Sequence, residues 1–163
     1  KGYSVQLIHE YLLKNNLNNH LIDIGGEVII NGNIHGNSWK VGIQDPSSYS
    51  DKPIYIIENS NKYLSIATSG EYRNFIVLDN GKTISHTINP ETLNSISSNV
   101  SSVTVVHENS ATYADAYATA LNVMGGLEAM NFANKNDIAL MLSFLNDGEV
   151  VLKFSNKWYD LGL

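Results

Sequence analysis

Cysteine is absent from this chain of 163 residues, and proline occurs only three times. Without thiols there is no disulfide framework, no thiolate nucleophile and no cysteine zinc site, although this absence assigns no compartment. Basic residues are also few, with 10 Lys and Arg against 16 Asp and Glu, and they form no cluster. A net charge of −6 without a basic patch argues against binding to the phosphate backbone of nucleic acids.

Long apolar runs are also absent, since none approaches the roughly 18 residues of a membrane helix. We therefore expect neither a transmembrane helix nor a signal peptide. Hydrophobic residues make up 43% of the chain, enough to fill the core of one domain, and we interpret residues 1–163 as a single domain. Because the chain begins with Lys and a helical pattern follows at once, we expect it to be the C-terminal part of a longer protein.

Helical spacing of apolar residues predicts a first helix from Ser4 to about Asn16, with Ser4 as its N-cap. Turn residues then separate short β-rich runs. An Asp-Asn-Gly turn at residues 79–81 favours a hairpin. The runs predict strands at residues 20–24, 27–31, 38–43, 54–58, 63–68 and 74–78.

For the second half of the chain we expect one more strand, two helices and a final hairpin. Small and apolar residues predict a helix from Ala111 to Met124 that ends at Gly125-Gly126, and a second helix over 127–134. Alternating residues predict strands over 102–107, 138–144 and 149–154. The fold class is therefore α+β, with a mostly antiparallel sheet packed with helices.

Asp115 and Thr119 are the best candidates for a metal site. They lie four positions apart on a predicted helix, so both side chains point the same way. A carboxylate and a hydroxyl suit magnesium, which also accepts oxygens from a diphosphate. The alternative is an ordinary helix in which Asp favours the dipole and Thr bonds back to a carbonyl, and the spacing alone favours this alternative.

Other polar residues admit both a chemical and a structural interpretation. His86 could act as a base, but a lone His in a β-rich segment is more often structural or exposed. Lys1 could be a fraying terminal cation. The pair Gly25-Gly26 is more often a turn than a phosphate site, and no Walker or dinucleotide fingerprint occurs. Surface or core positions are expected for His9, His20, His35 and His107.

Five segments, in their order and spacing, resemble the ApbE family of FAD:protein FMN transferases from end to end of the chain. The resemblance implies a T-fold-like α+β domain. It also implies that an N-terminal half is absent, because the first segment lies in mid-protein in that family. The segments are Lys1-Gly2-Tyr3, Ile24-Gly25-Gly26-Glu27, Thr68-Ser69-Gly70-Glu71-Tyr72-Arg73, Ser85-His86-Thr87-Ile88-Asn89-Pro90-Glu91-Thr92 and Ala114-Asp115-Ala116-Tyr117-Ala118-Thr119.

The resemblance implies a role for five residues. Asp115 and Thr119 would bind magnesium, and His86 would take a proton from the acceptor hydroxyl. Lys1 would contact FAD, and Ile88 would contact the flavin nucleotide.

Three positions depart from the family pattern. Ala118 stands where a further Asp ligand often occurs, so we expect a weaker metal site. Asn89 replaces an Asp, which removes a charge that could orient a neighbour. Leu93 replaces a Gly, which could change a turn.

The activity implied by the resemblance is a magnesium-dependent transfer of FMN from FAD onto a Thr or Ser hydroxyl of a target flavoprotein, with release of AMP. Two alternatives stay open, an FAD pyrophosphatase that uses water and a catalytically weak flavin-binding or interaction module. The chain by itself could be inactive because it is truncated. The family also implies an extracytoplasmic lipoprotein held at the membrane by a lipid anchor outside this chain.

Overall fold

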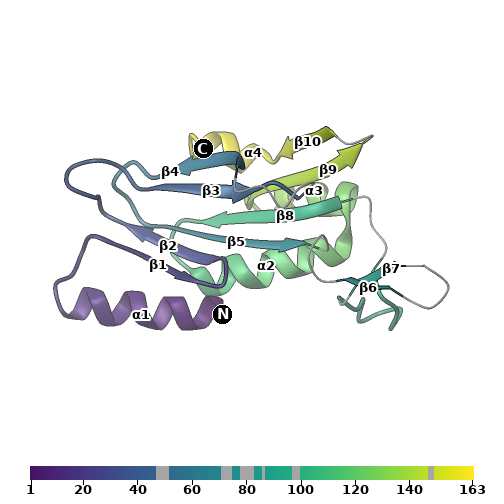
Figure 1. The fold of residues 1–163 in the computed structure, drawn as a ribbon, viewed down its shortest axis with the longest axis horizontal. Coiled ribbons are helices and arrows are strands. Elements are labelled where there is room, and N and C mark those ends of the chain that lie inside the picture. The colour runs from purple at the N-terminus through teal and green to yellow at the C-terminus, as the bar shows by residue number, and fades with distance from the viewer. Residues whose placement is uncertain (47–51, 71–74, 78–82, 86, 97–99, 147–148) are drawn as a thin grey trace.

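A six-stranded sheet in which every ladder is antiparallel forms the centre of the computed structural model (Figure 1). The structure describes residues 1–46, 52–70, 75–77, 83–85, 87–96, 100–146 and 149–163. In spatial order the strands are β1 (His20–Ile24), β2 (Glu27–Asn31), β5 (Leu64–Gly70), β8 (Val100–His107), β9 (Ala139–Asn146) and β10 (Glu149–Phe154).

Helices cover one face of this sheet, and a hairpin with a short helix covers the other (Figure 1). The first layer holds α1 (Gly2–Lys14), α2 (Ala111–Met124) and α3 (Gly126–Lys135). The opposite layer holds β3 (Lys40–Gln44), β4 (Pro53–Glu58) and α4 (Asn156–Asp160). Apart from this sheet, β6 (Phe75–Val77) pairs antiparallel with β7 (Thr83–Ser85).

Both faces of β9 are buried over its first six residues, which explains its nearly continuous apolar sequence. In β9, Leu140 and Leu142 pack toward α2 and α3, whereas Ala139 and Met141 pack toward α4 and the β3–β4 hairpin. Side chains of successive residues point to opposite faces of a strand, so one strand contributes to two cores. Within the described part of the chain, no helix has the length and apolarity required to cross a bilayer.

The predicted α+β class is confirmed, and so are the bounds of β1, β2 and α2. Ser110 begins α2 as a side-chain N-cap, because its Oγ accepts a hydrogen bond from the Tyr113 N–H at 3.3 Å. Gly125 ends that helix with φ 81°. The turns predicted at 79–81 and 147–148 lie outside the described residues.

Two local predictions are wrong, and one short helix was not predicted. Ser4 is not the N-cap of the first helix, because α1 already begins at Gly2 with Lys1 in the cap position. Gly126 does not end a helix but is the first residue of α3. The short helix α4 was not predicted, although its Trp158 is completely buried in the core between the sheet and the β3–β4 hairpin. Its five residues are too few to show a helical period.

A buried histidine pair joins α1 to β1. His9 Nδ1 lies 2.8 Å from His20 Nε2, and His20 Nδ1 lies 2.8 Å from the Leu17 carbonyl. A carbonyl only accepts, so we assign the hydrogen to His20 Nδ1, and His9 Nδ1 then donates to His20 Nε2. Burial lowers the pKa of His9, His20 lowers it further, and Glu10 opposes the shift.

We predict that stability falls on acidification partly through this pair. The unfolded chain takes up a proton on His9 near pH 6.5, whereas the folded chain resists it, so the free energy of unfolding decreases as the pH falls through about 6.5. Urea unfolding at about pH 7.5 and about pH 5.5 should give a smaller decrease in His9→Gln than in the wild type. The exposed His35 provides the control, since His35→Gln should keep the wild-type decrease. Equal decreases in all three proteins would contradict the assignment.

Candidate active site

A cleft of about 1070 Å³ runs along α2 between the start of α1, residues 87–91 and α3. It brings together four of the five predicted site residues, because Lys1, Ile88, Asp115 and Thr119 all line it. The fifth, His86, lies outside the described residues, but Thr87 lines the cleft. Residues far apart in the sequence therefore share one site.

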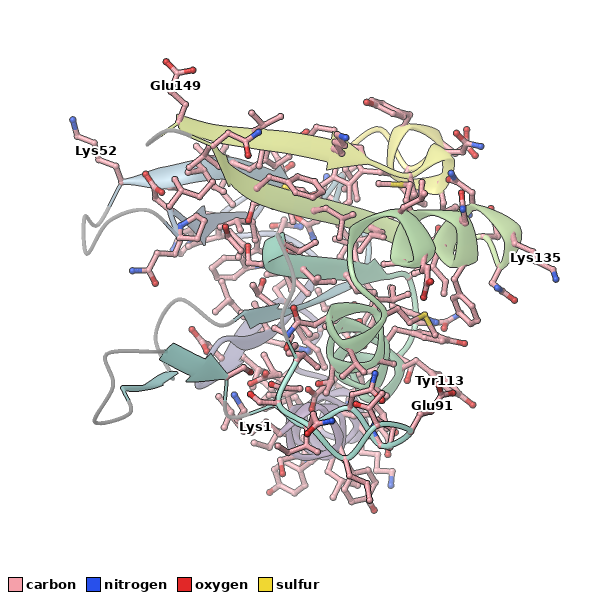
Figure 2. The ribbon with its side chains drawn as sticks, turned by 90° about the vertical axis from the view of Figure 1, so that its right-hand side faces the viewer. Lys1, Lys52, Glu91, Tyr113, Lys135 and Glu149 are labelled. Atoms are coloured by element: carbon pink, nitrogen blue, oxygen red, sulfur yellow. The ribbon has the colours of Figure 1, made fainter. Side chains whose placement is uncertain are left out.

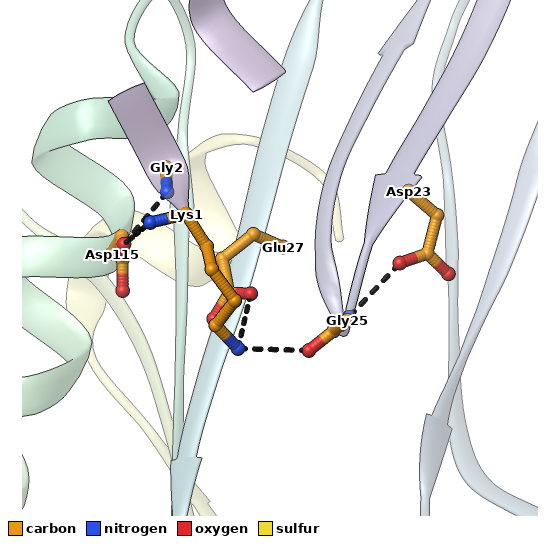
Figure 3. Close-up of polar contacts among 7 residues, drawn as sticks. Lys1, Gly2, Asp23, Gly25, Glu27 and Asp115 are labelled. Carbon is orange, nitrogen blue, oxygen red and sulfur yellow. Dashed lines mark hydrogen bonds and ion pairs between the residues drawn. The ribbon is translucent and has the colours of Figure 1, made fainter. Parts of the chain in front are cut away.

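The Asp115 carboxylate is held by the first turn of α1 (Figure 3). The Gly2 N–H donates a hydrogen bond to Asp115 Oδ2 at 2.7 Å, so a side chain of α2 caps the N-terminus of α1. A Cβ on Gly2 would lie 2.4 Å from the Ala111 carbonyl oxygen and 2.5 Å from Asp115 Cβ. Glycine is therefore required for this approach of the two helices.

Asp115 keeps an acceptor for a ligand. Its side chain is 30% exposed, and only Oδ2 is engaged by the described residues. Thr119, one turn later, is exposed in the same cleft, and its hydroxyl has no hydrogen-bond partner in the described part of the chain. The alternative in which Thr119 bonds back to a helix carbonyl is thus not observed.

The position of Ala118 does not support the expectation that this residue weakens the metal site. Ala118 is 1% exposed and packs in the apolar core with Ala67 and Val103, away from the cleft. A carboxylate at this position would be buried among alkyl groups, at a high cost in desolvation. In this chain the alanine contributes to packing between α2 and the sheet.

Lys1 is anchored, so the interpretation as a fraying cation is wrong (Figure 3). Its Nζ donates to the Gly25 carbonyl at 2.9 Å and lies 2.6 Å from Glu27 Oε2. Gly25 and Gly26 form the predicted turn, with φ 60° and 96°, and the Gly26 N–H donates to Asp23 Oδ1 at 2.9 Å.

Glu27 is a residue whose contact the sequence did not predict. The sequence pointed to it only through its place after the Gly25-Gly26 turn and within the family segment Ile24-Gly25-Gly26-Glu27, without a contact. It is buried there with 5% exposure.

The cleft is acidic on balance. Glu91, Asp115 and Glu128 line it, and Lys1 is the one basic side chain among its described lining residues. Figure 2 shows Lys1 and Glu91 at the same end of the molecule. An anionic ligand such as a diphosphate therefore requires a further positive charge in this cleft.

Residues 87–94 form a tight turn beside the cleft. Ile88 is 52% exposed, so its side chain offers apolar surface to a ligand. Asn89 Oδ1 accepts hydrogen bonds from the N–H groups of Glu91 at 2.8 Å and Thr92 at 3.2 Å. An Asp would make the same turn, so the amide preserves the local geometry.

Leu93 occupies a backbone conformation that favours glycine. Its φ is 57°, in the left-handed region, and its side chain is 78% exposed. The Gly of the family pattern would adopt this conformation without strain. The substitution by Leu therefore keeps the turn and adds strain to it.

Comparison with known proteins places the chain in a family. The profile described as the ApbE family matches residues 1–142. The chain belongs to the ApbE family. Two curated relatives named FAD:protein FMN transferase are similar to it. The relative from Haemophilus influenzae is 33% identical over 162 residues, which cover 99% of this chain and 46% of the relative. The relative from Vibrio cholerae is 39% identical over 150 residues, which cover 91% and 44%.

Solved structures of the ApbE family share the fold. The apo form of the flavinyl transferase ApbE from Pseudomonas stutzeri superposes with a TM-score of 0.82 at 28% identity, and the match covers 98% of this chain and 48% of that one. The apbe protein from Thermotoga maritima gives a TM-score of 0.80 at 27% identity, with 98% and 50% covered. The chain thus spans half or less of the length of these ApbE proteins.

We predict that Leu93→Gly stabilises the protein by about 1 kcal/mol, because it relieves a positive φ and removes an exposed side chain that buries little surface. Chemical denaturation of both proteins measures the difference. Leu93→Ala is the control, since it removes the same side chain but keeps a Cβ at positive φ, and it should give no comparable gain. A loss of stability in Leu93→Gly would contradict the assignment of backbone strain to Leu93.

Proposed function

We propose that this ApbE-family chain carries the catalytic cleft of a magnesium-dependent FAD:protein FMN transferase. The observation that supports this most is the meeting of Lys1, Ile88, Asp115 and Thr119 in one cleft of about 1070 Å³. A volume of this size suits a dinucleotide better than a single small metabolite. Curated relatives named FAD:protein FMN transferase supply the substrate class.

Asp115 and Thr119 fit a magnesium ion. They offer one carboxylate and one hydroxyl on adjacent turns of α2, and the described residues contain no group of three or more His, Asp or Glu that could form a full protein cage. Magnesium typically takes one or two carboxylates and completes its shell with water and phosphate oxygens. When bound, it would neutralise the diphosphate in this acidic cleft.

The chain's own residues orient the substrate and manage the proton. Lys1 binds a phosphate oxygen, and the exposed Ile88 packs on the flavin nucleotide. The hydroxyl oxygen of a Thr or Ser in the target flavoprotein forms a bond to the phosphorus of the FMN moiety. The bond from this phosphorus to the AMP oxygen breaks, AMP leaves with the electron pair, and His86 takes the hydroxyl proton. The place of Thr87 in the cleft supports this role for His86.

The proposal includes the location that the family resemblance implies, an extracytoplasmic lipoprotein whose lipid anchor lies outside residues 1–163. A secreted or membrane-bound flavoprotein would then be the acceptor. The proposed function includes no nucleic-acid partner, in keeping with the net charge of −6.

We predict that Asp115→Asn and Thr119→Val each lower magnesium-dependent FMN transfer by about 100-fold or more, since the first removes the negative charge of the carboxylate ligand and the second removes the hydroxyl ligand. Asn keeps an oxygen that can accept the hydrogen bond from Gly2, so the contact between α1 and α2 should survive. The assay contains the complete protein, FAD, magnesium and an acceptor flavoprotein, and it measures both AMP and covalently bound FMN.

Asp160→Asn is the matched control, because it removes an exposed carboxylate from α4 in the opposite layer. Its transfer rate should equal that of the wild type. Wild-type rates in both cleft variants would overturn the metal assignment. AMP release without covalent FMN would identify water as the acceptor and the protein as an FAD pyrophosphatase.

A further inference from the structure

Lys1 lies where two clefts meet. Besides the cleft of about 1070 Å³, it lines a second cleft of about 390 Å³ whose walls come from the β1–β2 turn, β3 and β5. A side chain that faces both clefts can contact a ligand that extends from one into the other. The position of its ammonium group therefore matters for binding, and Lys1 carries that group on a flexible four-carbon chain.

The two side chains of the Glu27–Lys1 ion pair differ strongly in burial. The Glu27 side chain is 6% exposed at the first position of β2, whereas the Lys1 side chain is 54% exposed. Lys1 Nζ, 2.6 Å from Glu27 Oε2, is the one positive charge paired with this carboxylate among the described residues, and the contact is an ion pair without hydrogen-bond geometry. A buried carboxylate requires a partner of opposite charge. The Glu27 carboxylate therefore holds the flexible Lys1 side chain in place.

The β1–β2 hairpin makes this anchor rigid. The two strands pair over their full length up to Ile24 and Glu27. The turn between them is closed by the Gly26 N–H bond to Asp23 Oδ1. Gly25, in the same turn, accepts the hydrogen bond from Lys1 Nζ at 2.9 Å. Both partners of the ammonium group, the Glu27 carboxylate and the Gly25 carbonyl, therefore come from one small structural unit.

The ammonium group keeps donors for a ligand. Of its three N–H bonds, one donates to the Gly25 carbonyl, whereas Glu27 Oε2 is an ion-pair partner at 2.6 Å without hydrogen-bond geometry. A free N–H can bind an acceptor in either cleft. A phosphate oxygen is a suitable acceptor, because the hydrogen bond is charge-assisted.

We propose that Glu27 is a positioning residue that holds Lys1 Nζ at the junction of the two clefts, so that a free N–H of this ammonium group binds a phosphate oxygen of the dinucleotide. This inference rests on the proposed function for its ligand, and it adds a residue to which no role has been assigned. Glu27 does not touch the ligand in this account. Its effect passes entirely through Lys1.

The test is a double-mutant cycle on FAD affinity in the complete protein. Glu27→Gln and Lys1→Met should each weaken FAD binding about tenfold, measured by calorimetry. The double variant should bind no more weakly than Lys1→Met, because Glu27 has no effect once the amine is gone. Glu58→Gln is the matched control, since it removes another carboxylate paired with a lysine, Lys40 at 3.2 Å, and should bind FAD as the wild type does.

Two results would overturn the positioning role while the proposed function stands: wild-type affinity in Glu27→Gln, or additive losses in the double variant. An absence of FAD binding in the wild type would instead overturn the proposed function and the positioning role with it. If Glu27→Gln does not fold, the Glu27→Asp variant tests the positioning role instead. The measurement is then the rate at which an acylating reagent modifies the Lys1 amine, compared with the wild type. Several-fold faster modification supports the role, and an unchanged rate overturns it.

Discussion

The hydrogen bond from the Gly2 N–H to Asp115 Oδ2 is the contact on which the site depends. It joins the N-terminus of α1 to the first turns of α2 through two residues that are 113 positions apart in the sequence. The bond gives α1 the cap that its own sequence lacks and fixes the orientation of the Asp115 carboxylate. Because Lys1 immediately precedes Gly2, the same contact places the one basic side chain among the described lining residues beside the acidic wall of the cleft.

Much of the fold could be predicted because the local signals agree with the tertiary structure. Ser110 and Gly125 mark the ends of α2, and short β-rich runs separated by turn residues mark β1 and β2. The start of α1 could not be predicted, because its cap comes from Asp115 on another helix rather than from a neighbouring side chain. Sequence reasoning about caps considers only local partners, and here it selected Ser4.

The candidate site was predictable as a set of residues, but not as a network of contacts. The spacing of Asp115 and Thr119 placed both on one helix face, and the structure agrees. The same spacing says nothing about Ala118, which points into the core, or about Glu27, which is buried beneath Lys1. Such relations depend on how α1, α2 and the β1–β2 hairpin pack together, and no local pattern encodes that packing.

We propose that the starts of α1 and α2 form one divalent cation site that receives a diphosphate. Titration of the isotopically labelled protein with Mn²⁺ in the presence of FAD tests this site directly, because a paramagnetic ion broadens the amide signals nearest to it. We predict that the signals of Gly2, Asp115 and Thr119 broaden first. Broadening centred on another acidic group, such as Glu108 and Asp137 around Lys157, with unchanged signals along α2, would contradict it.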